Sequence, residues 1–385
     1  MKIGTLTFHI TSNYGALLQA YALQKILNRL GHSAEIVDYR YVGSENQLCT
    51  RLRDCRSLQR KKEYVKDAVW WFTGPAGYGR RQRILRCRDF IKTHIPVSVE
   101  SFSSYRDLAE KALCYDAYIT GSDQVWNPTM QETVNGAFRL EFVPEGRLRI
   151  SYAASFGVPS LLPELSSVYG AAFRKFDFIS VREAEGVQIV REATDGKKAQ
   201  VVLDPTMLLS QDDWLSISIP SQKHKRNGYI LCYFLGEFED SSHFIYQLQS
   251  HFKLPIVYIG FNKKLLFNSK IKLESGAGPR EFLGLFAGAA HIVTNSFHGA
   301  VFSILFKKSF YSPLGTNTFR KPMNGRLSNL ADMFNLSGRI CELSEMKISE
   351  KCIDYDKIEL LLDREREKSL NFLKISLKSS GLTKS

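Results

Sequence analysis

The order of apolar runs and helical patterns is the feature that most restricts how this chain can fold. Short apolar runs at residues 2–8 and 33–39 enclose an amphipathic helical pattern at residues 15–30, and the same order recurs along the chain. Strands that alternate with helices form parallel sheets, which helices cover on both faces. The sequence therefore predicts an α/β fold built on parallel sheets.

A polar, lysine-rich connection at residues 218–227 interrupts this order, which then resumes with an apolar run at residues 228–236. A chain of 385 residues is also too long for one ordinary domain. We predict two Rossmann-like domains, residues 1–210 and 225–355, followed by a C-terminal helix and tail at residues 356–385. In open parallel sheets, ligands bind at the carboxyl ends of the strands, so any site should lie there.

The composition favours a cytoplasmic protein without metal ions or cofactors. All seven cysteines stand singly, and no CxxC motif or His/Cys cluster occurs, which indicates reduced thiols and argues against structural zinc. No apolar run reaches the length of a membrane span, and the N-terminus reads as a strand instead of a secretory signal.

The net charge of +13 is concentrated in one segment. Residues 51–94 hold thirteen lysine and arginine residues against four acidic ones, together with aromatic residues that include Tyr64, Trp70, Trp71, Phe72 and Tyr78. This combination suits an anionic membrane surface. The alternative is a helical insertion whose aromatic residues face the core and whose arginines are solvated. No nucleic-acid-binding motif accompanies the segment, so we expect no nucleic-acid partner.

Polar residues follow five of the predicted strands at the point where each strand ends. Alone, each group is compatible with a turn or a helix cap. Because the carboxyl ends of parallel strands meet at one edge of a sheet, the groups together predict a binding site. They are Asn13-Tyr14-Gly15, residues 121–124, Arg182-Glu183, Asp204-Pro205 and residues 295–299.

His298 is the sharpest candidate among these residues. Ser296 is a predicted N-cap, which places His298 in the first turn of a helix, where free N–H groups and the helix dipole favour an anion. His298 is therefore predicted to donate to an anion or to act as a general acid. The alternative is a buried histidine that caps a neighbouring carbonyl group.

Arg182 and Asp123 are the other two candidates for chemistry. A guanidinium after a buried strand can bind a carboxylate or phosphate in bidentate fashion, or it can form an ion pair with Glu183 or Asp204. Asp123 can take a proton from a sugar hydroxyl while Trp126 stacks on the sugar face. It can equally cap a short helix.

Six blocks of the chain resemble the polysaccharide pyruvyl transferase family: FHITSNYGALLQAYALQ, YDAYITGSDQVWNP, SYAASFG, ISVREAEGV, VVLDPTMLL and TNSFHGAVFSILF. They occur in the family's order and cover roughly residues 3–340, apart from the 51–94 segment. The resemblance implies a GT-B-like architecture with an interdomain cleft. It also implies a ketal pyruvyltransferase that moves the enolpyruvyl unit of phosphoenolpyruvate onto two hydroxyls of a sugar in cell-surface polysaccharide biosynthesis, releasing phosphate.

The resemblance also assigns roles to individual residues. Arg182 and His298 match positions that handle phosphoenolpyruvate, and His298 is our choice of acid, with Asp123 as the base. A further basic residue that acts in some members corresponds to Lys321 or Arg326, although many members have Ser-Arg where this chain has Gly325-Arg326. The first domain is then the acceptor side and the second the donor side. Further substrate contacts are expected from Asn13, Tyr14, Gly15, Ser296, Phe297 and Gly299.

Two alternative functions follow from the same residues. One is a GT-B nucleotide-sugar glycosyltransferase, with the helix end at His298 on the diphosphate. The other is a non-catalytic, membrane-peripheral protein of glycan assembly, which the basic segment at residues 51–94 motivates. The acceptor of a pyruvyltransferase could itself be lipid-linked and meet the enzyme at the inner face of the cytoplasmic membrane.

Overall fold

The computed structural model describes residues 1–40, 75–111, 113–130, 135–236, 238–265, 268–315 and 324–378. These residues form two compact α/β units. The first unit contains the described residues of Met1–Gln47, Ile91–Leu209 and Leu361–Ser385. The second contains those of Leu48–Phe90 and Ser210–Leu360.

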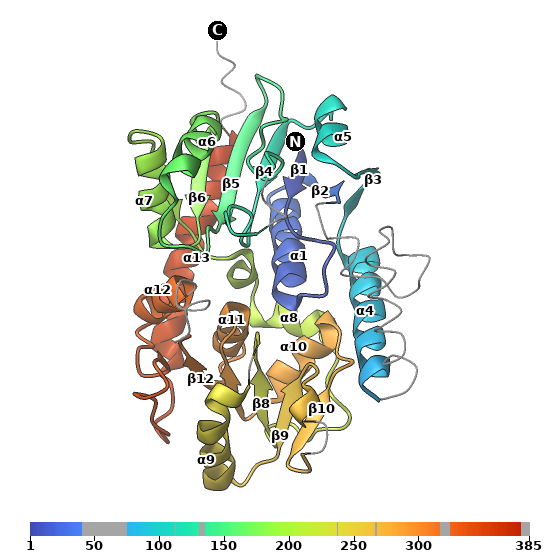
Figure 1. The fold of residues 1–385 in the computed structure, drawn as a ribbon, viewed down its shortest axis with the longest axis vertical. Coiled ribbons are helices and arrows are strands. Elements are labelled where there is room, and N and C mark those ends of the chain that lie inside the picture. The colour runs from blue at the N-terminus through green and yellow to red at the C-terminus, as the bar shows by residue number, and fades with distance from the viewer. Residues whose placement is uncertain are drawn as a thin grey trace. The chain divides into compact units, whose positions relative to one another are not determined.

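The first unit is built on a seven-stranded parallel sheet of order β3-β2-β1-β4-β5-β6-β7 (Figure 1). The strand order reverses between β1 and β4, and such a reversal is where ligands of open α/β sheets usually bind. The bounds are β1 Lys2–Leu6, β2 Ser33–Tyr39, β3 Val97–Phe102, β4 Ala117–Thr120, β5 Leu148–Ala154, β6 Phe178–Val181 and β7 Gln200–Val201.

The second unit has a six-stranded parallel sheet of order β10-β9-β8-β11-β12-β13, and its strand order reverses between β8 and β11. The bounds are β8 Ile230–Tyr233, β9 Ile256–Ile259, β10 Ile271–Glu274, β11 His291–Thr294, β12 Ser309–Pro313 and β13 Ile340–Cys341. Both sheets confirm the parallel α/β architecture predicted from the alternating pattern.

Helices connect the strands in both units. The first unit contains α1 Tyr14–Arg29, α5 Tyr105–Glu110, α6 Pro163–Arg174, α7 Ala184–Ala193 and the 3₁₀ turn η3 Pro205–Leu208. The second contains α8 Gln211–Ile217, η4 Glu239–Ser241, α9 Ser242–Phe252, η5 Lys263–Leu265, α10 Pro279–Gly288, α11 Phe297–Leu305 and α12 Gly325–Phe334. Two longer helices, α4 Pro75–His94 and α13 Tyr355–Lys378, contribute residues to both units. Across the described part of the chain, none of the helices is both long enough and apolar enough to span a bilayer.

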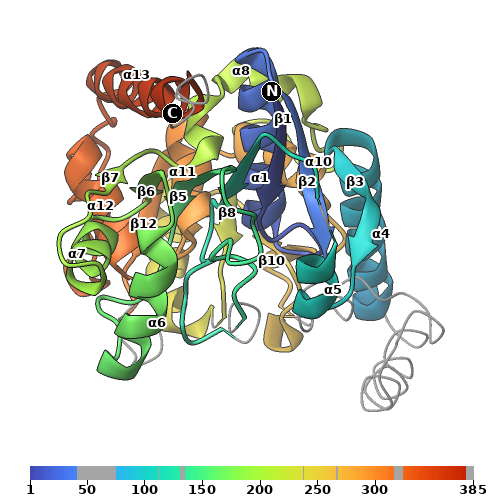
Figure 2. The ribbon, with the colours of Figure 1, turned by 90° about the horizontal axis from the view of Figure 1, so that it is seen from above.

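The core of the first unit forms around the sheet, with α6 and α13 on opposite sides of β5 and β6 (Figure 2). On one side, the ring of Phe173 in α6 packs 4.5 Å from that of Trp126. On the other side, Phe372 of α13 lies 6.4 Å from Tyr152 of β5, and Ser369 Oγ accepts a hydrogen bond from Leu203 N at 2.9 Å. These contacts fix the carboxyl ends of β4 to β7, where the predicted site residues lie.

The observed units differ from the predicted domains in two places. The described part of the basic segment, as far as Phe90, groups with the second unit instead of the first. The C-terminal helix is not a separate appendage, because its residues from Leu361 group with the first unit. Arg366 of this helix donates to the carbonyl oxygens of Met207 and Leu209, which ties it to the end of η3.

Candidate functional site

Arg182 is the centre of a buried cluster at the strand ends of the first unit. It directly follows β6, and its side chain is only 2% exposed. Its Nη1 lies 3.0 Å from Asp204 Oδ2, and its Nη2 lies 3.5 Å from Asp123 Oδ1. Glu183 Oε2 lies 4.0 Å from Arg182 Nε. Residues that follow three different strands of one sheet, β4, β6 and β7, are therefore brought together, as the sequence predicted.

Asp204 is the most rigidly held acid of this cluster. It follows β7 and caps η3, so Thr206 donates to Asp204 Oδ1 from both its backbone N, at 3.0 Å, and its Oγ1, at 2.7 Å. Ser122 Oγ donates to the other oxygen, Oδ2, at 3.0 Å. With Arg182 as a further donor, both oxygens of this fully buried carboxylate are hydrogen-bonded, as a buried charge requires.

Asp123 is held by its backbone and keeps the most exposed carboxylate of the three. Its φ of 73° lies in the left-handed region, where a short polar side chain is better tolerated than most. Its carbonyl oxygen accepts from Ser155 N at 2.9 Å, which fixes the turn against the end of β5. The Asp123 side chain is 12% exposed, against 0% for Asp204 and 4% for Glu183.

Glu183 accepts hydrogen bonds from the turn after β5. Its Oε1 accepts from Ser155 Oγ and Phe156 N, both at 2.8 Å, and from Gly157 N at 3.4 Å. These donors compensate a carboxylate that is almost fully buried. Glu183 thus joins the ends of β5 and β6 and closes the cluster on that side.

The electrostatics of the cluster are set by one guanidinium among three carboxylates. Burial alone would lower the pKa of Arg182, but the charges of Asp204, Asp123 and Glu183 outweigh burial and raise it. Three carboxylates thus surround one guanidinium. The ion pair with Asp204, which the sequence allowed as an alternative, is present; a contact of Arg182 with phosphoenolpyruvate stays a prediction.

The turn after β1 contributes an exposed polar group at the same sheet edge. Asn13 caps α1 because its Oδ1 accepts from Gly15 N at 3.0 Å and from Ala16 N at 3.4 Å. The Tyr14 side chain is fully buried, and Gly15 is buried as well. Of the predicted Asn13-Tyr14-Gly15 group, the structure thus leaves Asn13 exposed.

A second polar pair, which was not predicted from the sequence, lies at this edge. His9 follows β1, and its Nε2 lies 3.1 Å from Asp38 Oδ1 at the end of β2, while its Nδ1 lies 3.2 Å from Thr7 O. Arg40 Nη2 lies 3.1 Å from Asp38 Oδ2. Both ring nitrogens of His9 are occupied, so we treat the pair as structural. Acidic and basic residues at two adjacent strand ends were the signal that could have identified it.

Trp126 lies in the core instead of at a surface that could stack on a sugar. Its side chain has no exposed area, and its Nε1 donates to Phe138 O at 3.0 Å. The rings of Phe156, Phe173 and Phe176 surround it at 4.5–5.7 Å. An indole with one polar atom is readily buried when that atom finds a partner. The predicted role of Trp126 in acceptor binding is therefore not supported.

In the second unit, Ser296 caps α11 as predicted, since its Oγ accepts from Gly299 N at 3.4 Å. His298 lies in the first turn of this helix and is 7% exposed. Phe297 is equally buried, and its ring centroid lies 5.2 Å from that of His298. Gly299 is required by close packing, because an added Cβ would lie 2.2 Å from Thr294 Oγ1.

The strand next to β11 also leads into a helix that carries a candidate cation. After β12, Gly315 N donates to Asn324 Oδ1 at 2.9 Å, and Asn324 Nδ2 donates back to Gly315 O at 2.9 Å. This reciprocal pair holds the start of α12, whose first turn contains Arg326. Helices α11 and α12 contact each other, and the first turn of each carries one of the candidates, His298 in α11 and Arg326 in α12. Lys321 lies outside the described residues.

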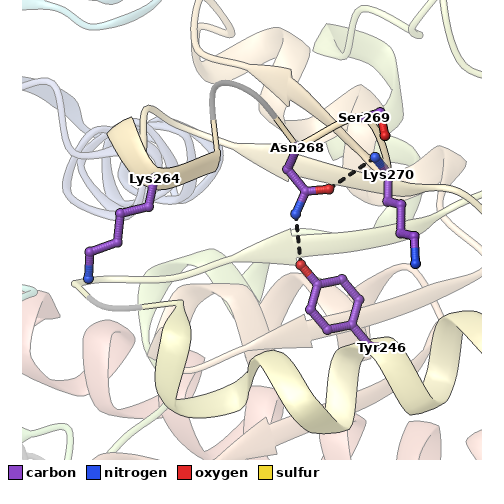
Figure 3. A pocket seen from close by; sticks show the side chains of 5 residues that line it. All are labelled: Tyr246, Lys264, Asn268, Ser269 and Lys270. Atoms are coloured by element: carbon purple, nitrogen blue, oxygen red, sulfur yellow. Dashed lines mark hydrogen bonds between the residues drawn. The ribbon is translucent and has the colours of Figure 1, made fainter.

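A cavity of about 520 Å³ opens elsewhere in the second unit (Figure 3). Asn268 Nδ2 donates to Tyr246 Oη at 2.8 Å across it, and Lys264 Nζ lies 3.4 Å from Glu239 Oε1 at its side. None of its lining residues is a predicted site residue, so we give it no part in the chemistry below. The lining is Tyr246, Lys264, Asn268, Ser269 and Lys270.

Comparison with known families shows which family of enzymes this chain belongs to. The polysaccharide pyruvyl transferase family matches residues 13–316. The chain belongs to this family. It is therefore a transferase, and the blocks that contain Asp123, Arg182, Asp204 and His298 all fall within the matched region. No curated protein matches the sequence.

Solved structures are similar to this chain at low sequence identity. A putative UDP-N-acetylglucosamine 2-epimerase from Listeria monocytogenes has a TM-score of 0.50 and 11% identity, over 98% of this chain and 96% of the other. The UDP-GlcNAc 2-epimerase of Methanocaldococcus jannaschii gives 0.48 and 13%, over 97% and 99%. The E. coli heptosyltransferase WaaC gives 0.42 and 10%, over 95% and 100%. The two parallel sheets and the similarity to the Listeria monocytogenes structure confirm the predicted GT-B-like fold, and at this identity the similarity concerns the fold alone.

Proposed function

We propose that this pyruvyl transferase moves the enolpyruvyl unit of phosphoenolpyruvate onto two hydroxyls of a sugar and releases phosphate, in the biosynthesis of a cell-surface polysaccharide. The observation that carries the proposal is the buried Asp123–Arg182–Asp204 cluster at the strand ends of a chain of this family. Phosphoenolpyruvate is a cytoplasmic metabolite, so a cytoplasmic location is part of the proposal.

The first unit is assigned to the acceptor. Its cluster places three carboxylates around one guanidinium, which suits a neutral sugar hydroxyl better than the multiply charged phosphoenolpyruvate. Asp123 has the most exposed carboxylate and is the general base that takes the hydroxyl proton. Asn13, exposed at the neighbouring strand end, is an additional hydrogen-bonding group for the sugar.

Arg182 acts on this chemistry through Asp123. Its two terminal nitrogens contact Asp204 and Asp123, and a guanidinium is planar, so holding one nitrogen fixes the direction of the other. Asp204, fixed by Thr206 and Ser122, is thus the anchor of the arrangement. In this assignment Arg182 and Asp204 are positioning residues and Asp123 is the catalytic residue, in place of the contact of Arg182 with phosphoenolpyruvate that the resemblance implies.

The second unit is assigned to the donor. The capped N-terminus of α11 offers backbone N–H groups and a favourable dipole to an anion, and Ser296, Phe297 and Gly299 build that helix end. Arg326, in the first turn of the neighbouring α12, adds positive charge. Lys321 is retained as a second candidate from the resemblance. His298 is the general acid toward phosphoenolpyruvate.

The reaction balances with these groups. His298 gives a proton to the methylene carbon, which becomes a methyl group and leaves C2 as an oxocarbenium-like centre. A sugar hydroxyl attacks C2 as Asp123 takes its proton, and a C2–O bond forms. The bond from C2 to the phosphate oxygen then breaks, and phosphate leaves with the proton that Asp123 had taken. A second hydroxyl attacks C2 and gives its proton to His298, which restores the acid. The products are a cyclic ketal and inorganic phosphate.

The test is incubation of the enzyme with phosphoenolpyruvate labelled at the methylene carbon and a panel of neutral and lipid-linked sugars. We expect a new ketal methyl signal by NMR together with equimolar phosphate. Thermal-shift titration should show stabilisation by phosphoenolpyruvate and none by UDP or GDP. Stabilisation by a nucleotide, with no ketal signal on any acceptor, would instead favour a nucleotide-sugar glycosyltransferase. No phosphate release and no stabilisation by any of these ligands would favour a non-catalytic role.

A further inference from the structure

Helix α4 has two faces of different character, and one of them is packed. Buried residues recur along it at Ile84, Cys87 and Phe90, one helical turn apart. Gly79 approaches Ser275 so closely that an added Cβ would lie 1.9 Å from Ser275 Oγ. This face is held against the segment between β10 and α10.

Arg86, at the edge of the packed face, is used in this attachment. Its Nη1 donates to Gly276 O at 2.8 Å, and its Nε lies 3.3 Å from Glu281 Oε1. The Arg86 side chain thus links α4 to its two neighbouring elements and stabilises their packing. Arg86 therefore does not count toward an interaction surface, although it contributes to the basic composition of the segment.

The opposite face is exposed and mixes cations with large apolar groups. Tyr78 is 66% exposed and Leu85 is 40% exposed. Arg81 and Lys92 are also exposed, and at 100° per residue the four side chains form one stripe along the helix. Arg88 and Asp89 flank this stripe on its two sides, so the exposed face is basic overall but not exclusively so.

We propose that the Tyr78–Arg81–Leu85–Lys92 stripe of α4 contacts the surface of an anionic lipid bilayer. Lysine and arginine are attracted to anionic headgroups, each by about 1 kcal/mol near the surface. A tyrosine and a leucine between them match the boundary of headgroups and acyl chains, where an aromatic ring and an aliphatic side chain lose exposed apolar area. A purely electrostatic partner such as a nucleic acid would gain nothing from Leu85. The inference goes beyond the proposed reaction and does not depend on it.

Flotation with vesicles of phosphatidylcholine, with and without phosphatidylglycerol, tests the proposal on the full-length protein. We expect flotation only with phosphatidylglycerol and weaker flotation at high salt. The Arg81→Gln/Lys92→Gln variant should bind at least about tenfold more weakly, because two surface cations are lost. The Tyr78→Ser/Leu85→Ser variant should lose the part of binding that survives added salt.

The control variant Lys253→Gln/Lys347→Gln removes the same charge from exposed positions of the second unit outside α4 and should bind like wild type. Equal weakening in both charge variants would attribute binding to net charge and overturn the proposal, as would the absence of flotation in wild type. If the protein binds heparin through Arg81 and Lys92 but does not bind vesicles, the partner of the stripe is a soluble polyanion and the proposal is wrong. Ketal formation on a water-soluble acceptor should be unchanged in Arg81→Gln/Lys92→Gln, which separates this outcome from a failure of the proposed reaction.

Discussion

At the scale of single residues, the structure changes the role that we assign to Arg182. The sequence shows an arginine after a buried strand, a pattern that suits an anion ligand. The structure shows a guanidinium already engaged by Asp204 at 3.0 Å and Asp123 at 3.5 Å, with Glu183 beside it. Asp204, 22 positions away, was one of the partners that the sequence left open, whereas Asp123, 59 positions away, was not expected as a partner. Residue types at strand ends are predictable, whereas their pairing depends on the assembled sheet.

Asp204→Asn tests the positioning role of this carboxylate. The substitution keeps the shape but removes the charge that holds Arg182, so Asp123 loses its fixed orientation. We expect kcat to fall by about a hundredfold, since small misplacements of catalytic groups cost that much, while KM for phosphoenolpyruvate changes little. The free energy of unfolding should fall by about 3 kcal/mol, because a buried ion pair loses one partner. The measurement is steady-state kinetics well below the melting temperature.

Ser369→Ala is the matched control for Asp204→Asn. Ser369 Oγ supports Leu203 N, the neighbour of Asp204, without touching the cluster. Its loss should lower the free energy of unfolding by about 1–3 kcal/mol and leave kcat unchanged. Ser122→Ala, which removes one donor to Asp204, should give an intermediate loss of kcat if Asp204→Asn does not fold. A loss of kcat in Ser369→Ala equal to that in Asp204→Asn would contradict a specific role for Asp204.

At the scale of elements, the sequence was most informative where burial is complete. The central strands and helix α11 were predicted because their apolar runs are continuous or periodic, and Ser296 marked the helix start. Strand β3 was missed because it is an edge strand whose residues are exposed or only partly buried, apart from Phe102. Strand β13 has two residues and carries no pattern. The burial of Trp126 was also missed, since only the packed sheet shows which side of the turn faces the core.

Gly299→Ala tests whether the close contact of α11 with β11 positions His298. The added Cβ would lie 2.2 Å from Thr294 Oγ1, and Thr294 is fully buried, so the helix start must move. We expect a loss of about 1–3 kcal/mol in stability from overpacking, and a fall in kcat as His298 shifts. Gly338→Ala, in the same unit, introduces a Cβ into open space and should leave both quantities unchanged. Thermal unfolding and kinetics of the two variants give the comparison, and wild-type kcat in Gly299→Ala would remove His298 from the proposed mechanism.

At the scale of the whole molecule, a chain with a formal charge of +13 becomes still more positive in acid, so its buried carboxylates determine its acid stability. Asp38, whose side chain is 13% exposed, is a carboxylate whose pKa shift has a clear direction. Burial alone would raise the pKa of Asp38, but the hydrogen bond and charge of His9 and the charge and hydrogen bond of Arg40 lower it. A carboxyl group whose pKa is lower in the folded state stabilises that state above its unfolded pKa of about 3.9, and this stabilisation disappears as the pH falls through the folded pKa.

The corresponding prediction concerns the pH dependence of unfolding. Asp38→Asn should be less stable than wild type at neutral pH, and the difference in the free energy of unfolding should shrink as the pH is lowered below about 4. The difference shrinks because protonation of Asp38 in wild type removes the same negative charge that the substitution removes. Asp363→Asn breaks an ion pair with Arg366 in which Asp363 is 65% exposed, so it should have little effect at any pH. Urea unfolding of the three proteins at a series of pH values measures the difference, and a constant deficit of Asp38→Asn down to acidic pH would show that shape, not charge, accounts for its contribution.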